Sequence, residues 1–263
     1  MLFDSHVHSL ASPDSEMNAK EAIAALKNKG LGVVFTEHVD YVISEGRDHG
    51  ATDAYNGERD FVCDFDIYPS TYKSLRSKTT LLGLEIGLTA AYHSKNKETA
   101  AGDYDYILGS IHSVYGLDVY FTFPEGDAVN FIAKYLTCAR EMVEANDFID
   151  AFGHIDYVAR YNDDAKKNFL YDNYTSEFDA LLKAIAERNL AIEINTARFD
   201  QEDAIKNLMP IYRRFKELGG KYCTIGSDAH NLLRLGADID KAQDIADATG
   251  LRPVYFKERK MML

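Results

Sequence analysis

Short runs of apolar residues alternate with longer segments of helical periodicity along the chain. In Ser176–Arg188, for example, apolar side chains recur three and four positions apart and would share one helix face. The same spacing predicts a helix over Val129–Asn146. Another is expected over Asn18–Lys29, where Asn18 and Glu21 resemble a capping box and Gly30 a C-terminal stop. The apolar runs are short enough to be buried β-strands, and we expect them at Leu2–His8, Gly32–His38, Thr80–Gly87, Tyr106–His112, Ile149–His154, Leu190–Asn195 and Tyr222–Asp228.

This alternation predicts the fold class. Strands that are joined by crossover helices lie parallel in one sheet. The chain has 263 residues, and no internal repeat or Pro/Gly/Ser-rich linker divides it. We therefore expect one α/β domain over residues 1–263, built as a parallel barrel.

Ionisable side chains lie at or near the end of every expected strand. Because all strands of a parallel barrel end at one rim, these side chains should converge there. His6 and His8 would share one face of the first strand, as in a metal chelate. The other strand-end residues are Glu37, His38, Glu85, His112, His154, Glu193, Asp228 and His230, whereas His49 and His93 fall in expected loops. This sorting favours a metal site over scattered packing histidines.

The composition limits the kinds of partner that we expect the protein to bind. The formal net charge is −13, and no basic tract could follow a phosphate backbone, so we expect no nucleic-acid partner. No apolar run approaches the ~20 residues of a spanning helix, and no secretory signal pattern is evident, so we expect a cytoplasmic protein without membrane contact. Cys63, Cys138 and Cys223 show no metal-like spacing. The sequence leaves the oligomeric state open.

The strand-end motifs resemble those of the polymerase-and-histidinol-phosphatase (PHP) superfamily, and within it most closely the histidinol-phosphate phosphatases. The motifs are Asp4-Ser5-His6-Val7-His8-Ser9, Thr36-Glu37-His38, Gly83-Leu84-Glu85, Gly109-Ser110-Ile111-His112, Gly153-His154-Ile155-Asp156 and Gly226-Ser227-Asp228-Ala229-His230. The resemblance implies a distorted, TIM-like (β/α)7 barrel with a trinuclear metal site. It also implies hydrolysis of L-histidinol phosphate in histidine biosynthesis.

Carried over residue by residue, the resemblance implies three groups of metal ligands. The first metal would be bound by His6, His8, Glu85 and Asp228, and the second by Glu85, His112 and His154. The third would be bound by His38, His230 and one residue from the loop after the first strand, where we favour Asp14 over Glu16. Imidazole and carboxylate ligands suit three divalent ions of Zn, Fe or Mn without selecting among them.

A metal cluster can activate water and neutralise a phosphoryl group, so we expect direct attack by a hydroxide bridging the first two metals. Glu85 would lie beside this hydroxide, and no phosphoenzyme should form. Asp228, His230 or metal-bound water could donate the leaving-group proton.

Substrate contacts are expected from residues close to the strand ends. Arg160 and Arg198 follow strand-end motifs, and their planar guanidinium groups suit phosphate oxygens. Glu193 could orient a ligand or bind a cationic end of the substrate. The long segment from Val39 to Ser70 could form a lid, with Tyr41, Arg47, Asp48 and His49 as contacts.

Two other functions fit the same residues. A PHP phosphoesterase could act on phosphotyrosine peptides or nucleotides, and turnover of those substrates would distinguish it. A non-catalytic metal-binding barrel is the alternative from another class. Loss of function usually removes ligands, whereas here nearly every ligand position is filled, which favours an enzyme.

Overall fold

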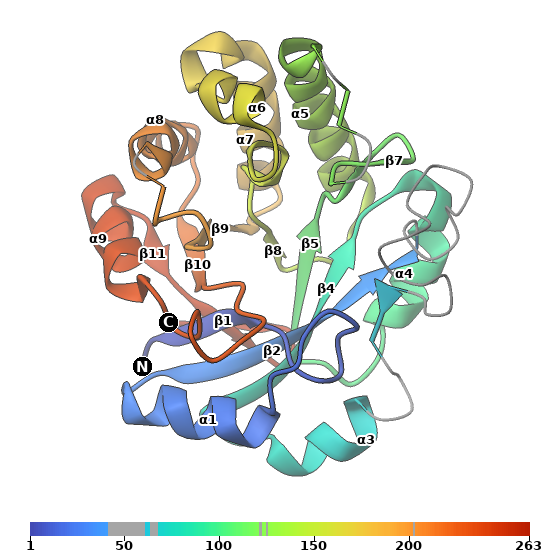
Figure 1. Cartoon of the computed structure of the whole chain (residues 1–263), viewed down its shortest axis with the longest axis vertical. Coiled ribbons are helices and arrows are strands. Elements are labelled where there is room, and N and C mark those ends of the chain that lie inside the picture. The colour runs from blue at the N-terminus through green and yellow to red at the C-terminus, as the bar shows by residue number, and fades with distance from the viewer. Residues whose placement is uncertain (42–60, 64–67, 121–122, 125, 202) are drawn as a thin grey trace.

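The computed structural model describes residues 1–41, 61–63, 68–120, 123–124, 126–201 and 203–263. Within them, parallel strands follow chain order around one curled sheet (Figure 1). These strands are β1 (Phe3–Val7), β2 (Gly32–Asp40), β4 (Thr80–Gly87), β5 (Tyr106–Ser110), β8 (Ala151–Phe152), β9 (Ala191–Asn195), β10 (Tyr222–Gly226) and β11 (Arg252–Pro253). A bridge between Val7 and Ala229 joins β1 to the segment after β10, so the sheet curls back on itself.

The predicted fold class, a distorted TIM-like α/β barrel, is confirmed, and each expected run contains a strand. β11 is an addition next to β10, and β3 (Phe61–Val62) pairs antiparallel with β2. β8 is shorter than expected. The backbone N–H of His154 donates to the Glu193 carboxylate at 2.7 Å instead of continuing the ladder. The assignment of residues 1–263 to a single domain stays a prediction.

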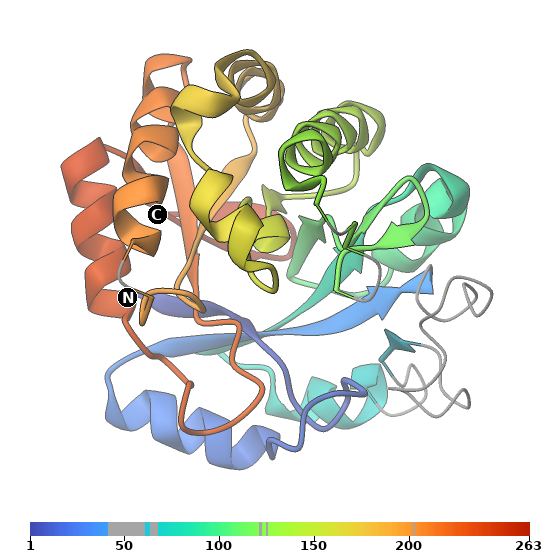
Figure 2. The same ribbon diagram turned by 45° about the horizontal axis from the view of Figure 1, so that its top comes forward.

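Helices surround the sheet (Figures 1 and 2). Those that were predicted are α1 (Ala19–Asn28), α5 (Ala128–Ala145) and α7 (Thr175–Glu187). α1 begins where Asn18 Oδ1 accepts from the backbone N–H groups of Lys20 and Glu21. A Schellman motif follows its last residue, with Gly30 at a φ of +74°. The others are α3 (Tyr68–Tyr72), α4 (His93–Ala100), α6 (Asp163–Asn168), α8 (Ala204–Glu217) and α9 (Ile239–Thr249).

Two hydrophobic cores occupy different sides of the sheet. The larger core lies between the outer strand faces and the helices and includes Phe35, Leu84 and Ile194. The smaller core fills the inside of the barrel at the amino-terminal ends of the strands and includes Val34, Leu81 and Leu108.

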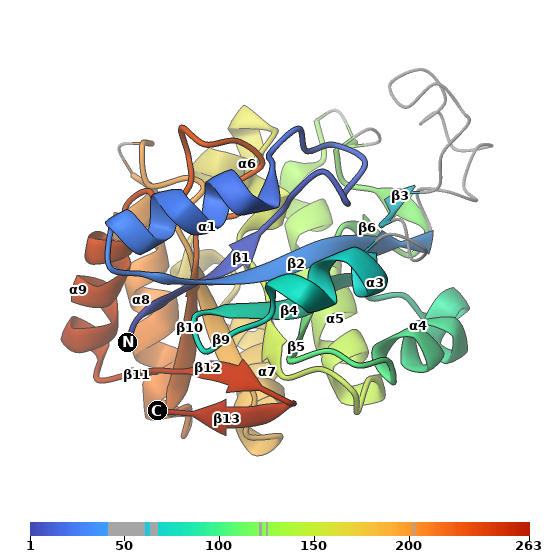
Figure 3. The same cartoon turned by 90° about the horizontal axis from the view of Figure 1, so that it is seen from below.

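The C-terminal hairpin covers this smaller core, and it consists of β12 (Tyr255–Lys257) and β13 (Lys260–Met262) (Figure 3). Tyr255 stacks on Phe3, with ring centroids 4.3 Å apart, and Phe256 stacks on Tyr106 at 5.4 Å. The opposite, carboxyl-terminal ends of the strands are therefore the ends available for a site. Among the described residues, no helix is both long enough and apolar enough to cross a bilayer.

Candidate metal centre

The candidate ligands are on the strand faces that point into the barrel, and they lie together at one rim. On β4, Leu81 and Glu85 lie four positions apart and so face the same side, and Val34 and His38 do the same on β2. The apolar member of each pair belongs to the inner core, so the ionisable member lies above that core at the strand end. The barrel thus delivers the strand-end residues to a shared interior position.

The first ligand cluster brings together His6, His8, Glu85 and Asp228. The two Nε2 atoms are 3.0 Å apart. Oε2 of Glu85 lies 3.3 Å from His6 Nε2 and 3.5 Å from His8 Nε2. Oδ1 of Asp228 lies 3.5 and 3.4 Å from the same two nitrogens. Four donor atoms, from β1 and the residue after it, from β4 and from the segment after β10, therefore converge on one point.

The second cluster uses the other oxygen of Glu85. Oε1 lies 2.7 Å from His154 Nε2 and 3.3 Å from His112 Nε2, and these two nitrogens are 3.4 Å apart. Ser110 also donates its hydroxyl to Oε1 at 2.8 Å. Because its two oxygens face different clusters, Glu85 is placed to bridge two cations.

The third cluster lies toward solvent. His38 Nε2 and His230 Nε2 are 3.3 Å apart, and Oδ2 of Asp14 lies 3.4 and 3.0 Å from them. Asp14, rather than Glu16, is the loop residue in contact with these histidines. The Asp14 and His230 side chains keep 26% and 27% of their surface exposed, whereas the first two clusters are buried. The third cluster is therefore the one most accessible to an incoming ligand.

The donor set fits divalent transition metals because buried carboxylates fix the imidazole tautomers. Nδ1 of His6 contacts Glu193 Oε1 at 2.7 Å, and Nδ1 of His112 contacts Asp40 Oδ2 at 2.9 Å. A carboxylate accepts, so each Nδ1 carries the hydrogen and each Nε2 faces its cluster, where it would bind a cation through its lone pair. This is the usual support for a metal-binding histidine.

The electrostatics also favour bound cations. Burial would raise the pKa of Glu85, but His6, His112 and His38 hold it well below its usual value. Burial likewise opposes ionisation of Asp228, yet His6 and Arg160 hold its pKa well below normal. Ionised carboxylates at this depth require positive partners. Divalent ions would supply that charge.

The backbone at the rim is shaped for these contacts. A Cβ on Gly226 would collide with His6 and would lie 2.6 Å from Glu193 Oε1, so the motif glycine allows this close approach. Asp228 itself has a φ of +55°, a left-handed conformation that aspartate tolerates better than most residues. The turn after β10 is therefore specialised for the site.

Arg160 adjoins the first cluster. Its Nη1 donates to Asp228 Oδ2 at 2.7 Å, and its side chain is 15% exposed. Nε and Nη2 are buried and have no hydrogen-bond partner in the described part of the chain. The guanidinium lies 5.1 Å from the ring centroid of Tyr157, which itself packs against His112 and His154. Two unused donors thus lie beside the candidate ligands.

Among the residues that the structure describes, the others predicted to contact the substrate do not have unused donors beside the ligand clusters, as Arg160 does. Arg198 binds Asp156 Oδ2 through Nη1 at 2.8 Å and lines a separate pocket. Both oxygens of Glu193 are engaged, by His6 and by the His154 backbone, which favours orientation of a ligand over contact with substrate. Tyr41 is buried and pairs with Thr99 on α4 at 2.9 Å. Arg47, Asp48 and His49 lie outside the described residues.

Two supporting residues escaped the sequence analysis. Asp40, which orients His112, follows His38 by two positions on the same strand face. Ser110, which donates to Glu85, precedes His112 by two positions. The strand period of two was the signal that could have identified both.

Comparison with known proteins agrees with this arrangement. Residues 4–197 match the PHP domain family. The chain belongs to this family, which confirms the resemblance seen in the strand-end motifs. It is 38% identical over 99% of its length to a Clostridium acetobutylicum protein named "Probable histidinol-phosphatase", of which 99% is covered.

A Lactococcus lactis histidinol-phosphatase is 27% identical, with 94% of this chain and 91% of that protein covered. A crystal structure of histidinol phosphate phosphatase from Lactococcus lactis, complexed with zinc, L-histidinol and phosphate, superposes with a TM-score of 0.86. It is 25% identical and covers 100% of this chain and 99% of that chain.

Proposed function

We propose that the chain is a metal-dependent phosphatase that hydrolyses L-histidinol phosphate to L-histidinol and inorganic phosphate, a step of histidine biosynthesis. The observation that carries the proposal is the set of three ligand clusters around Glu85, with the partly buried Arg160 beside them. The histidinol-phosphatases among its relatives, and the relative whose structure contains zinc, L-histidinol and phosphate, support this substrate.

Three divalent ions would occupy the clusters, and zinc, iron and manganese all suit their imidazole and carboxylate ligands. When bound, they would supply a water activated to hydroxide between the first two sites, and charge to neutralise the phosphoryl oxygens. The protein side chains would hold these ions in fixed positions, and Glu85 would set the spacing between the first two. No side chain needs to act as a nucleophile.

Arg160 would bind the phosphate of the substrate. Nη1 stays on Asp228 while Nε and Nη2 donate to phosphate oxygens, which a planar guanidinium can do in parallel. Asp228 uses Oδ2 for Arg160 and directs Oδ1 toward the first cluster, so neither oxygen is available to carry a proton. The leaving alkoxide would therefore take its proton from His230 or from water.

The first test combines phosphate release with elemental analysis of protein that has been purified without chelator. L-histidinol phosphate is compared with a mononucleotide and a phosphotyrosine peptide. We expect strong preference for histidinol phosphate and bound transition metal. Preference for either competitor would keep the phosphatase and overturn the substrate, and full activity without metal would overturn the metal centre.

A matched pair of histidine variants sharpens this test. His112→Ala removes a ligand of the second cluster and should lower kcat/KM at least about a hundredfold and reduce the metal content. His93→Ala is the control because His93 pairs with Asn146, away from the clusters, at 2.9 Å. Equal activity of both variants would contradict the assignment of the second cluster.

The role of Arg160 predicts a KM effect. Arg160→Ala removes two charge-assisted hydrogen bonds to phosphate and should raise KM about ten- to a hundredfold with a smaller change in kcat. Arg160→Lys keeps the positive charge but loses the two parallel donors of the planar guanidinium. Its affinity for substrate should therefore be only partly restored relative to Arg160→Ala. An unchanged KM in Arg160→Ala would show that the phosphate binds elsewhere.

A further inference from the structure

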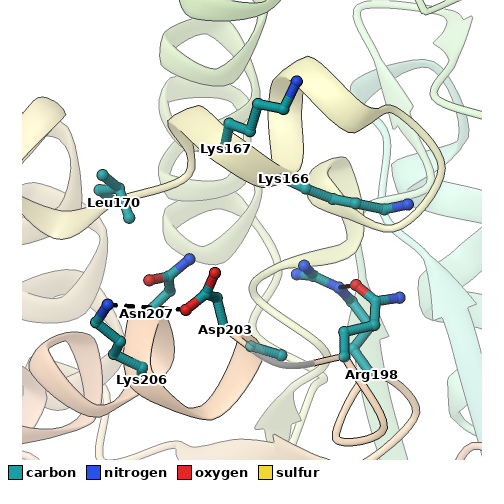
Figure 4. Close-up of a pocket in the computed structure, with 9 residues that line it drawn as sticks. Lys166, Lys167, Leu170, Arg198, Asp203, Lys206 and Asn207 are labelled. Carbon is teal, nitrogen blue, oxygen red and sulfur yellow. Dashed lines mark hydrogen bonds and ion pairs between the residues drawn. The ribbon is translucent and has the colours of Figure 1, made fainter.

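A cavity of about 440 Å³ lies between α6 and the beginning of α8, and we call it the α6–α8 pocket (Figure 4). α6 follows the carboxyl end of β8, and the segment that leads into α8 follows the carboxyl end of β9. The pocket therefore lies on the same side of the barrel as the ligand clusters. Its lining contains none of the cluster residues, so it is a separate space.

Positive charge dominates the wall of this pocket. Of the described residues that line it, Lys166, Lys167, Arg198 and Lys206 carry positive charge and Asp203 carries negative charge. This is unusual in a chain whose formal net charge is −13. A pocket lined by several cationic side chains raises the local concentration of small anions.

The lysines are held only weakly by the protein. Lys206 Nζ lies 3.7 Å from Asp203 Oδ1, and Lys166 Nζ lies 2.9 Å from Asp163 Oδ1. Both carboxylates are well exposed, at 69% and 83%. Surface ion pairs of this kind contribute little free energy. A ligand anion could therefore recruit both ammonium groups at little cost.

Arg198 gives the pocket a preorganised anion-binding group. Its side chain is buried, and it is fixed by hydrogen bonds from Nη1 to Asp156 and from Nε to Gln201, the latter 3.1 Å long. Nη2 has no hydrogen-bond partner among the residues that the structure describes. A buried guanidinium with an unused donor on a pocket wall is a strong position for a phosphate oxygen.

The arrangement of charges suggests the shape of the ligand. Figure 4 shows Lys166 and Arg198 toward one end of the pocket and Lys206 toward the other, where Leu170 also lies. Two separated cationic ends suit a molecule with an anionic group at each end and a neutral body between them. The volume is that of a small-metabolite site.

We propose that the α6–α8 pocket is a second ligand site, which binds a small organic bisphosphate with one phosphate on Lys166 and Arg198 and the other on Lys206. Binding there forms no covalent bond and does not use the ligand clusters. The pocket lysines do not belong to the metal centre, so their contribution can be tested separately from the proposed phosphatase activity.

The test uses a linear alkane bisphosphonate, which the enzyme cannot hydrolyse, and the monophosphonate of the same chain length. Isothermal titration calorimetry is run on the metal-loaded protein, on Lys166→Ala/Lys206→Ala and on Lys183→Ala/Lys241→Ala. The control removes two helix lysines that also pair with nearby carboxylates, Glu187 at 3.6 Å and Asp238 at 2.7 Å. Both double variants change the net charge equally.

We expect the bisphosphonate to bind one site per chain about tenfold more tightly than the monophosphonate. Lys166→Ala/Lys206→Ala should lose at least about tenfold in affinity, and the control should stay within about twofold. Phosphate release from histidinol phosphate should be similar in all three proteins. Equal affinity in the two double variants would overturn the site, because binding would then be at the metal centre or non-specific. A failure to hydrolyse histidinol phosphate would overturn the proposed function and leave this result intact.

Discussion

The two ends of the barrel interior are built from the same strands but from opposite kinds of residue. At the amino-terminal ends, Leu81 and Tyr106 pack with the C-terminal hairpin into an apolar core. Four to six positions further along the same inward rows, β4 carries Glu85 and the segment after β5 carries His112. Stacked aromatic rings close one end, and the other end gathers the carboxylates and imidazoles of the ligand clusters.

This difference indicates that the closed end of the barrel mainly stabilises the fold, whereas the open end holds the residues for chemistry. Burying apolar surface at the closed end stabilises the barrel, whereas burying ionised carboxylates at the open end opposes folding unless cations compensate. The open end can be strained in this way because the closed end and the outer helices already determine the fold. Changes at the two ends should therefore have separable effects on activity and on stability.

The largest effect on activity should come from Glu85, because its two oxygens serve two clusters. Glu85→Gln removes the negative charge and one acceptor oxygen, and it should lower kcat/KM about a thousandfold. Metal content, measured by elemental analysis, should fall with it. Glu98→Gln on the exposed surface of α4 is the control and should behave as the unmodified protein. Full metal content and activity in Glu85→Gln would refute the bridging role.

A smaller effect is expected from the carboxylate behind His112. Asp40→Asn weakens the acceptor that fixes Nδ1–H of His112 and should lower metal affinity or kcat/KM about ten- to a hundredfold. Asp103→Asn changes an exposed carboxylate and serves as the control.

Gly87→Ala should also disturb the contact between Asp40 and His112, by a different mechanism. A Cβ at Gly87 would collide with the Asp40 carboxylate and displace it. Normal metal affinity in both Asp40→Asn and Gly87→Ala would show that this support is dispensable.

The sequence predicted the barrel because its signals are local. Strand runs and the helix termini at Asn18 and Gly30 depend only on neighbouring residues. The hairpin β12–β13 was not predicted, since its strands are three residues long and carry charged residues. It gains its stability from Phe3 and Tyr106, far away in the sequence.

The residues of the candidate site also fall into two groups: those that local sequence signals predict, and those that depend on contacts between distant parts of the chain. Strand-end positions brought His6, His8 and His112 into consideration, because the carboxyl ends of parallel strands share one rim. Their supporting partners depend on tertiary contacts, with Glu193 lying 187 positions from His6 and Asp40 lying 72 positions from His112. The pairing of Arg160 with Asp228 likewise appears only in three dimensions.

The smallest effect on activity should come from the closed end, where the effect on stability should be greatest. Phe256 is 5% exposed and stacks on Tyr106, so Phe256→Ala should lower the free energy of unfolding by about 3 kcal/mol, measured by urea denaturation. Met262→Ala, in the partner strand and 38% exposed, should cost less than about 1 kcal/mol. In both variants kcat/KM of the folded protein should stay within about twofold, because the hairpin touches none of the ligand clusters. A loss of activity in Phe256→Ala as large as that in Asp40→Asn would show that the closed end positions the metal centre, and the two ends of the barrel would then have to be treated as one unit.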